Sequence, residues 1–237
     1  MHTLQKQFER EINETVEACG AAALRQYVTS QGGNLSWRVG PDRVLITPTK
    51  MNKGKIRFDD VLIVGADSRV LFAAEKREPT GEVRIHLGIY AKRPDIVSII
   101  HAHPTWLTAF ALSKPELLQM PWLPEPVIEV GPVALTEYAQ PLTEDLARKF
   151  DPVIMRHNAF LMRNHGAVVL CREGLSRCFE LLEMLETSAK SVAIAQMIGG
   201  ATPLSREAVK GLAETLRARN ARLPGAPGEV KDLADLY

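Results

Sequence analysis

Cysteine is scarce in this 237-residue chain. Cys19, Cys171 and Cys178 are the only three, and no pair of them has a short CxxC spacing. An odd number of widely spaced cysteines predicts neither a disulfide framework nor a cysteine-rich zinc site. The composition therefore favours a reducing compartment, and we expect a cytoplasmic protein.

Neither sign of charge dominates, and long apolar runs are missing. The 29 Lys and Arg residues nearly balance the 28 Asp and Glu residues, giving a formal net charge of +1. Nucleic acids and anionic membrane surfaces attract strongly basic proteins, and a bilayer span needs a far longer apolar segment than any present. We therefore expect a small-molecule partner, with no nucleic acid and no membrane.

The first 73 residues change from a helical to a strand-like pattern. Apolar residues recur at steps of three or four from Leu4 to Tyr27, which predicts an amphipathic helix that bends near Gly20. Between Asn34 and Phe72, short β-branched runs alternate with turn-like segments. This pattern is typical of an antiparallel meander.

The rest of the chain alternates between helices and strands. We expect a helix capped by Thr80 over 81–93, a strand over 96–100 and a short helix that has Pro104 in its first turn. The proline-rich segment 115–140 predicts a loop that leads to a strand near 127–130. Further expected elements are a helix over 143–149, a hairpin of 159–163 with 167–171, and helices over 174–200 and 206–219. No linker or repeat divides the chain, so we predict one α/β domain over 1–237, with a tail from about 220 to 237.

Two histidines lie one residue apart in the segment IVSIIHAHPTW, residues 96–106. Because side chains alternate along a strand, His101 and His103 are expected to share one side and to be able to bind one metal ion. A catalytic site needs a third protein ligand, and His165 in the turn-like RNHG is a candidate. The alternative is that these are polar residues at a strand end and in a turn.

Glu82 is expected in the first turn of the helix that Thr80 caps. A carboxylate is favoured there by the helix dipole, which is a sufficient structural explanation, while an acidic group beside the histidines is the functional one. His86 lies four residues further on, on the same helix face. It either supports Glu82 or simply packs.

Several of these segments occur together in one known family. The chain contains GGNLSWRV, VLITPTK, EPTGEVRIHLGIYAKRPDI, IIHAHPTWLTAFAL and RNHGAVVLCREGLSRCFELLEMLE in this order. From its first helix to about Ile198 it resembles the class II aldolase/adducin family, and the combination of motifs is more specific than any one of them. The resemblance implies an α/β fold with a mostly antiparallel central sheet flanked by helices, and a homotetramer with active sites at subunit interfaces.

The resemblance also implies a metal centre. His101, His103 and His165 correspond to the metal ligands of the family's sugar-phosphate aldolases, and Glu82 corresponds to the catalytic acid/base, which also contacts the metal when no substrate is bound. One divalent ion per subunit is implied, Zn²⁺ first, with Mn²⁺, Co²⁺ or Fe²⁺ as alternatives. Such an ion stabilises the enediolate left by carbon–carbon cleavage of a ketose 1-phosphate, while the carboxylate carries a proton.

By the same resemblance, the substrate phosphate is held by Gly33, Asn34, Thr49, Lys50, Thr80 and Gly81. Two of these positions depart from the family, which often has glycine in place of Lys50 and serine in place of Gly81. Lys50 either contributes a charge to phosphate binding or points outward. A tyrosine that some relatives supply from a neighbouring subunit is replaced by Ala134, so the leaving aldehyde oxygen has Tyr138 and Tyr237 as unassigned candidates.

Resemblance to small salvage aldolases favours 5-deoxyribulose 1-phosphate or 5-(methylthio)ribulose 1-phosphate, cleaved to dihydroxyacetone phosphate and an aldehyde in methionine or 5-deoxynucleoside salvage. The apolar Trp106 and Leu107 after HAHP would suit a poorly hydroxylated aldehyde, although Trp106 is equally suited to the core. Alternatives are a fuculose-1-phosphate aldolase and a metal-dependent decarboxylase or dehydratase of the same fold. An adducin-like binding module is the non-enzymatic alternative, and the retained histidines and Glu82 argue against it.

Overall fold

A computed structural model describes residues 3–237. In this part of the chain one eight-stranded sheet has the order β4-β3-β2-β1-β5-β8-β7-β6, and β6 with β7 is its one parallel pair. The fold is therefore α/β with a mostly antiparallel sheet, as expected. The strands are β1 (Asn34–Arg38), β2 (Arg43–Ile46), β3 (Leu62–Gly65), β4 (Val70–Phe72), β5 (Ser98–Ala102), β6 (Val133–Thr136), β7 (Ala159–Met162) and β8 (Gly166–Cys171).

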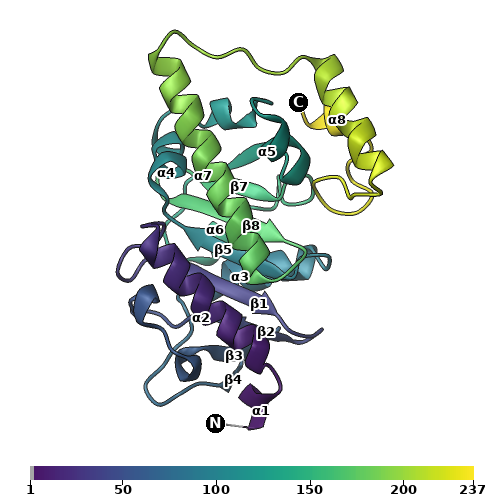
Figure 1. Cartoon of the computed structure of the whole chain (residues 1–237). Helices are drawn as coiled ribbons and strands as arrows, with labels where there is room; N and C mark the ends of the chain where they lie inside the picture. Colours follow the sequence, from purple (N-terminus) through teal and green to yellow (C-terminus); the bar gives the residue numbers. More distant parts are fainter. Residues whose placement is uncertain (1–2) are drawn as a thin grey trace.

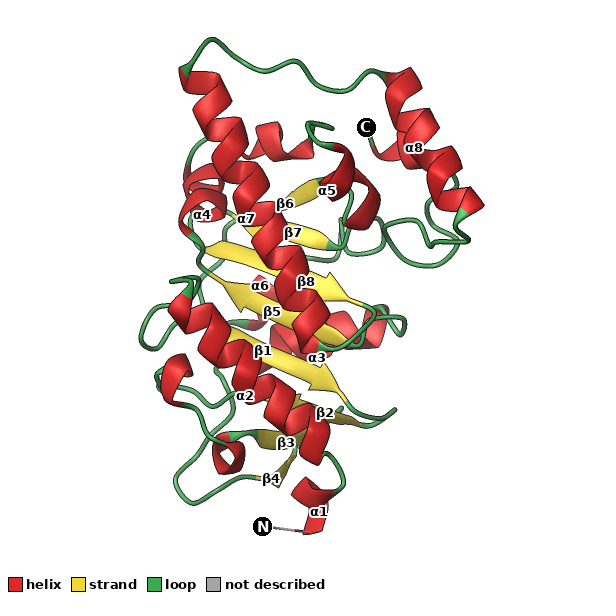
Figure 2. Cartoon of the chain, viewed as in Figure 1, coloured by secondary structure: helices red, strands yellow, loops and turns green. Residues whose placement is uncertain are grey.

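Helices cover both faces of this sheet (Figures 1 and 2). The helices α2 (Glu9–Leu24) and α7 (Leu175–Met197) lie across one face, and α3 (Val83–Lys92) and α6 (Glu144–Arg148) lie behind the other. Side chains alternate between the two faces along each strand, so the sheet contributes to an apolar core on each side. Leu35 and Ile100 are buried on the α2 and α7 side, whereas Ile46 and Ile99 are buried on the α3 side. Burying both faces explains why the strands are apolar almost throughout.

A third apolar cluster joins α5, α8 and the C-terminal turn η4. None of the helices described over residues 3–237 has the length and apolar character of a membrane span. The shorter elements are α1 (Thr3–Lys6), α4 (Thr105–Leu112), α5 (Pro124–Glu129), α8 (Arg206–Ala218), η1 (Lys53–Lys55), η2 (Phe58–Asp60), η3 (Pro115–Gln119) and η4 (Leu233–Leu236).

Two predicted features of the helices are wrong. The expected bend near Gly20 is absent, because α2 runs through it to Leu24 and the break falls earlier, between Lys6 and Glu9. An exposed glycine costs a helix only about 1 kcal/mol, which packing of the apolar face outweighs. The expected strand near 127–130 belongs instead to α5, which begins at Pro124. Proline suits a first helical turn because the amide that it lacks has no partner there.

Other local predictions are confirmed. The helix expected over 143–149 forms as α6, although Thr143 is its N-cap residue, which accepts a hydrogen bond from the Leu146 N–H, rather than part of its first turn. The β7–β8 hairpin forms around the predicted turn, and Asn164 has a φ of 55° there, a left-handed conformation that asparagine tolerates. The helix expected over 81–93 begins later than predicted. It is α3, which starts at Val83, so Glu82 is its N-cap residue rather than part of its first turn.

Candidate metal and active site

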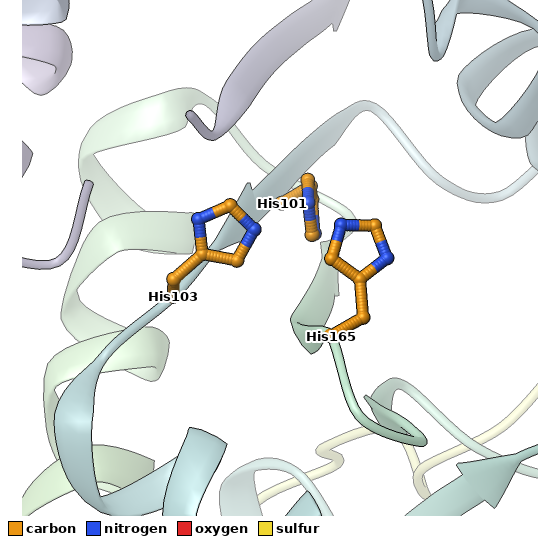
Figure 3. Close-up of side chains that lie close together, drawn as sticks. All are labelled: His101, His103 and His165. Atoms are coloured by element: carbon orange, nitrogen blue, oxygen red, sulfur yellow. The ribbon is translucent and has the colours of Figure 1, made fainter. Parts of the chain in front are cut away.

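The three histidines converge at one end of the sheet. His101 lies in β5, His103 directly follows that strand and His165 lies in the β7–β8 turn. Figure 3 shows the three rings turned toward one point, with candidate ligand nitrogens within 4.8 Å of one another. The ring centroids are 4.7 to 5.3 Å apart. Strand order produces this meeting, because β5 and β8 are neighbours in the sheet.

Close backbone packing holds His103 in place. Its N–H donates to the carbonyl oxygen of Tyr27 at 2.7 Å. A Cβ on Gly166 would lie 2.5 Å from Cδ2 of His103 and 2.6 Å from the backbone oxygen of Ala102. Only glycine therefore fits at the last position of the NHG motif while His103 keeps its place.

The imidazoles present lone pairs for a metal. Nδ1 of His101 lies 3.0 Å from the carbonyl oxygen of Ala167, which can only accept, so this nitrogen carries the proton. Nε2 of His101 is buried without a hydrogen-bond partner. Burial lowers the pKa of His103 to about 3 and that of His165 to about 4, so both rings are neutral at pH 7. An orphaned nitrogen and neutral rings are the donor set that a divalent ion such as zinc requires.

Glu82 faces the histidines from the N-terminal end of α3. Its carboxylate oxygens lie 3.3 Å from Nε2 of His101 and 3.5 Å from Nε2 of His165. Burial opposes ionisation of this carboxyl group, but the electrostatic effect of the neighbouring His101 and a 2.8 Å hydrogen bond from Asn34 outweigh it and lower the pKa. The structure thus places an ionised carboxylate beside the candidate metal ligands.

The segments predicted to bind phosphate are hydrogen-bonded to one another. The Thr49 N–H donates to the carbonyl oxygen of Glu78 at 2.9 Å, and the Thr80 N–H donates to that of Thr47 at 3.1 Å. The hydroxyl of Thr47 accepts from the Leu35 N–H at 3.1 Å. These bonds draw together the three segments that contain Gly33, Asn34, Thr49, Lys50, Thr80 and Gly81, next to Glu82. The side chain of Asn34, however, is engaged with Glu82 and His86.

Both departures from the family pattern have a structural account. Lys50 is exposed and has a φ of 52°, the left-handed conformation in which glycine is the least strained residue. A Cβ on Gly81 would lie 2.6 Å from Cδ2 of Leu142. The space that a serine side chain would need here is therefore occupied by the leucine.

Two supporting residues were missed by sequence reasoning. Lys53 is 2% exposed, and its ammonium donates to the carbonyl oxygens of Gln31 at 3.3 Å and Met51 at 3.0 Å. It thereby joins the segment before Gly33 to the segment after Lys50. No sequence signal marks it, because a lysine among polar turn residues is ordinarily solvated.

The second missed residue is Glu186 of α7. Its carboxylate accepts from the backbone N–H groups of Trp106 and Leu107, each at 2.9 Å, and so caps the helix that follows HAHP. Burial raises the pKa of this carboxyl group. A signal was present but ambiguous, since Glu186 lies on the apolar face of an otherwise regular helix.

The structure also shows the surroundings of the aromatic and apolar residues that were candidates for substrate contact or proton transfer. Leu107 is fully buried, so the expectation that it faces the substrate is wrong, and Trp106 packs against the same core. Tyr237 packs in the C-terminal apolar cluster, while Tyr138 is 55% exposed. Within residues 3–237 no hydrogen bond joins either tyrosine to Glu82 or to the three histidines.

The family model for the Class II Aldolase and Adducin N-terminal domain matches residues 13–193. This range includes Glu82 and the three histidines, His101, His103 and His165. The chain belongs to the class II aldolase and adducin family. The resemblance drawn from its motifs is thereby confirmed.

Characterised family members of two activities are similar to the chain. It is 33% identical over 174 residues to the 3-oxo-tetronate 4-phosphate decarboxylase of Escherichia coli K12, covering 72% of this chain and 80% of the relative. It is 31% identical over 179 residues to the L-fuculose phosphate aldolase of Methanocaldococcus jannaschii, covering 74% and 91%. Aldolases and decarboxylases of this family are metal-dependent lyases, and so this chain is a divalent-metal-dependent carbon–carbon lyase.

Solved structures of family members share the fold. YgbL from Klebsiella pneumoniae superimposes with a TM-score of 0.79 at 27% identity, covering 86% of this chain and 98% of that one. An L-fuculose 1-phosphate aldolase gives a TM-score of 0.75 at 26% identity, covering 88% and 96%. The sheet and its flanking helices are therefore a family property, whereas the substrate depends on individual side chains.

Proposed function

We propose that this lyase cleaves the bond between the α- and β-carbons of a carbonyl group in a small phosphorylated substrate and releases dihydroxyacetone phosphate. The observation that carries the proposal is the convergence of three imidazoles and one buried carboxylate at one end of the sheet. A divalent ion in this donor set, Zn²⁺ in first place and Mn²⁺, Co²⁺ or Fe²⁺ as alternatives, supplies positive charge that stabilises an enediolate.

Glu82 is the proposed acid/base. Cleavage of a ketose 1-phosphate between C3 and C4 leaves an electron pair on C3, which must then take up a proton. The carboxyl group of Glu82 lies beside the histidine nitrogens and is oriented by the N–H of Asn34. It is therefore placed to hold this proton and to deliver it to the carbon.

The phosphate is the proposed anchor of the substrate. The backbone amides and hydroxyls around Gly33, Thr49 and Thr80 lie on segments joined to one another beside Glu82. Lys50, exposed on the same loop, adds a positive charge close to this anchor. We propose 5-deoxyribulose 1-phosphate or 5-(methylthio)ribulose 1-phosphate as the substrate, with fuculose 1-phosphate as the competing sugar and a salvage pathway as the setting.

Decarboxylation is a second candidate. Loss of carbon dioxide from a 3-oxo-tetronate 4-phosphate leaves the same enediolate, and protonation again gives dihydroxyacetone phosphate. Several relatives that match at 30 to 33% identity carry this activity in their names. Carbon dioxide also leaves without a hydroxyl proton to remove, which suits a site in which Glu82 is the one carboxylate that contacts the histidines within residues 3–237.

An aldolase needs a second group that exchanges a proton with the aldehyde oxygen. We propose that a neighbouring subunit of a homotetramer supplies it, with Tyr138 and Tyr237 as candidates. The half-exposed ring of Tyr138 supports this proposal, because it is available to another subunit.

The test combines metal analysis with product release. The purified enzyme is assayed for dihydroxyacetone phosphate from the two pentulose phosphates, fuculose 1-phosphate and 3-oxo-tetronate 4-phosphate, before and after chelation and metal return. Release from a sugar supports the aldolase, and release together with carbon dioxide from the keto acid supports the decarboxylase. Bound metal with no release from any of these compounds would overturn the proposal.

A further inference from the structure

A line of buried polar side chains leads away from Glu82 into the protein. Nδ2 of Asn34 lies 2.8 Å from Oε2 of Glu82, and Oδ1 of Asn34 lies 2.5 Å from Nε2 of His86. Beyond the ring, Nδ1 of His86 lies 2.6 Å from Oγ of Ser36, which lies 2.9 Å from the hydroxyl of Tyr90. Each member is less than one tenth exposed.

Two regular elements provide these contacts. Asn34 and Ser36 are two residues apart on β1 and share a face, while His86 and Tyr90 are four residues apart on α3, which covers that face. Two strand residues and one helical turn both advance by roughly 6 Å, so the two pairs match along their lengths. Asn34 is also paired directly with His101 in the sheet. The line therefore ends beside the metal-ligand strand.

Donor and acceptor chemistry gives this line a direction. A carboxylate only accepts, so Asn34 must turn its NH₂ group to Glu82 and its oxygen to His86. Nε2 of His86 must then carry the ring proton, which leaves Nδ1 to accept from the hydroxyl of Ser36. Because Ser36 uses its one proton on His86, the single proton of the Tyr90 hydroxyl is shared between Ser36 Oγ at 2.9 Å and the carbonyl oxygen of Val97 at 3.2 Å. Each contact between neighbouring members of the line therefore pairs a donor with an acceptor.

We propose that His86 is a positioning residue, which fixes the amide of Asn34 and through it the orientation of the Glu82 carboxylate against the metal ligands. The inference rests on the proposed function in so far as Glu82 is the acid/base. Without the ring N–H, the Asn34 amide can rotate and present its oxygen to the carboxylate, which repels it. Burial lowers the pKa of His86 to about 3, so the ring stays neutral and keeps one donor and one acceptor.

The kinetic test compares two replacements of similar size. His86→Leu removes the donor, whereas His86→Gln places an amide N–H near the position of Nε2. We expect kcat to fall about 10- to 100-fold in the leucine variant, with KM changed less than about twofold, and most of kcat to return in the glutamine variant. Bound metal and thermal unfolding are measured for both. An equal loss of kcat in the two folded, metal-loaded variants would overturn the proposal.

A second measurement needs no substrate. The ¹⁵N shifts of the His86 ring in labelled enzyme report which nitrogen is protonated. We expect the proton on Nε2, and a mixture of the two ring forms in Ser36→Ala, where the donor to Nδ1 is gone. A proton on Nδ1 in the unmodified enzyme would overturn the proposal, because Asn34 would then have no fixed orientation.

The two measurements separate failure of this proposal from failure of the proposed function. If the ring proton is on Nε2 but no phosphorylated substrate is cleaved, the arrangement stands and the proposed substrate class fails. If a substrate is cleaved and His86→Leu retains full kcat, the positioning role alone fails.

Discussion

Two buried polar clusters lie at opposite ends of α3, and they are satisfied in different ways. Beyond its C-terminal end, Arg93 is fully buried and donates to both carboxylate oxygens of Asp95, to the amide oxygen of Asn158 and to the carbonyl oxygens of Ile154 and His157. These bonds use all five of its N–H groups. The arginine cluster is therefore complete within the chain.

The histidine cluster at the other end is not complete. Among the described residues, Nε2 of His101 is buried beside Glu82 and has no hydrogen-bond partner. Native proteins rarely leave such atoms unpaired, and exceptions call for an explanation such as a bound ion. Burial of polar groups therefore does not by itself mark a site. The histidine cluster differs from the arginine cluster because a buried nitrogen that faces Glu82 has no hydrogen-bond partner within the described residues.

Loss of one ligand should produce the largest effect on function. In His103→Ala the enzyme should lose its bound metal and its activity should fall to background, because two imidazoles no longer hold the ion. The metal-free variant should unfold at a denaturant concentration close to that of the metal-free parent. Metal analysis, kinetics and denaturation check this. A variant that keeps both metal and activity would contradict the assignment of His103 as a ligand.

Removal of the carboxylate should affect chemistry more than metal binding. Glu82→Gln keeps the shape and the bond with Asn34 but cannot exchange a proton. We expect kcat to fall by about 10²- to 10⁴-fold, the usual contribution of a general acid or base, while the histidines retain the metal. Steady-state kinetics and metal analysis of the metal-loaded variant test this expectation. Retention of near-parental kcat would exclude Glu82 as the acid/base.

The arginine cluster should respond in stability rather than in activity. Arg93→Met leaves Asp95 buried with Arg172 as its remaining partner, and we expect a loss of about 3 kcal/mol in the free energy of unfolding. The neighbouring Lys92→Met is the matched control, because Lys92 pairs with Asp151 at the surface and should cost less than about 1 kcal/mol. Urea denaturation separates the two. Equal losses would show that burial does not distinguish these charges.

The buried histidines should also make the free energy of unfolding of the metal-free protein decrease in acid. Burial lowers the pKa values of His86 and His103 to about 3 and that of His165 to about 4, against an ordinary value of 6.5. Between about pH 4 and 6.5 the unfolded chain therefore binds more protons than the folded one, and stability falls as the pH falls.

Each of these histidines contributes up to about 1.4 kcal/mol per pH unit in this window. Urea denaturation at pH 7, 6 and 5 checks the slope. His86→Gln should reduce the slope by less than about one third, because burial also lowers the pKa of His157, which adds to the slope. A free energy of unfolding that does not change over this range would contradict the buried, neutral state of the rings.

Much of the fold follows from local pattern, and its exceptions are instructive. The turn at Asn164 and the helix that follows Thr143 depend on residues three or four apart, and both elements are confirmed, although Thr143 caps its helix rather than lying in the first turn. The segment 127–130 was misread because Val127 and Ile128 suit a strand as well as the buried face of a short helix. Packing of α5 against α8 decides between them.

The sequence by itself determined the motifs: two histidines at alternate positions, a third in a turn followed by glycine, and an acidic residue near the start of a helix. These are short-range features, and residue type and spacing suffice to define them. Only the tertiary structure decided that Glu82 faces His101 and His165, that Asn34 turns toward Glu82 over 48 residues of sequence, and that Lys53 and Glu186 support the site. Such contacts depend on strand order and on the packing of α3 and α7 against opposite faces of the sheet, which no local periodicity encodes.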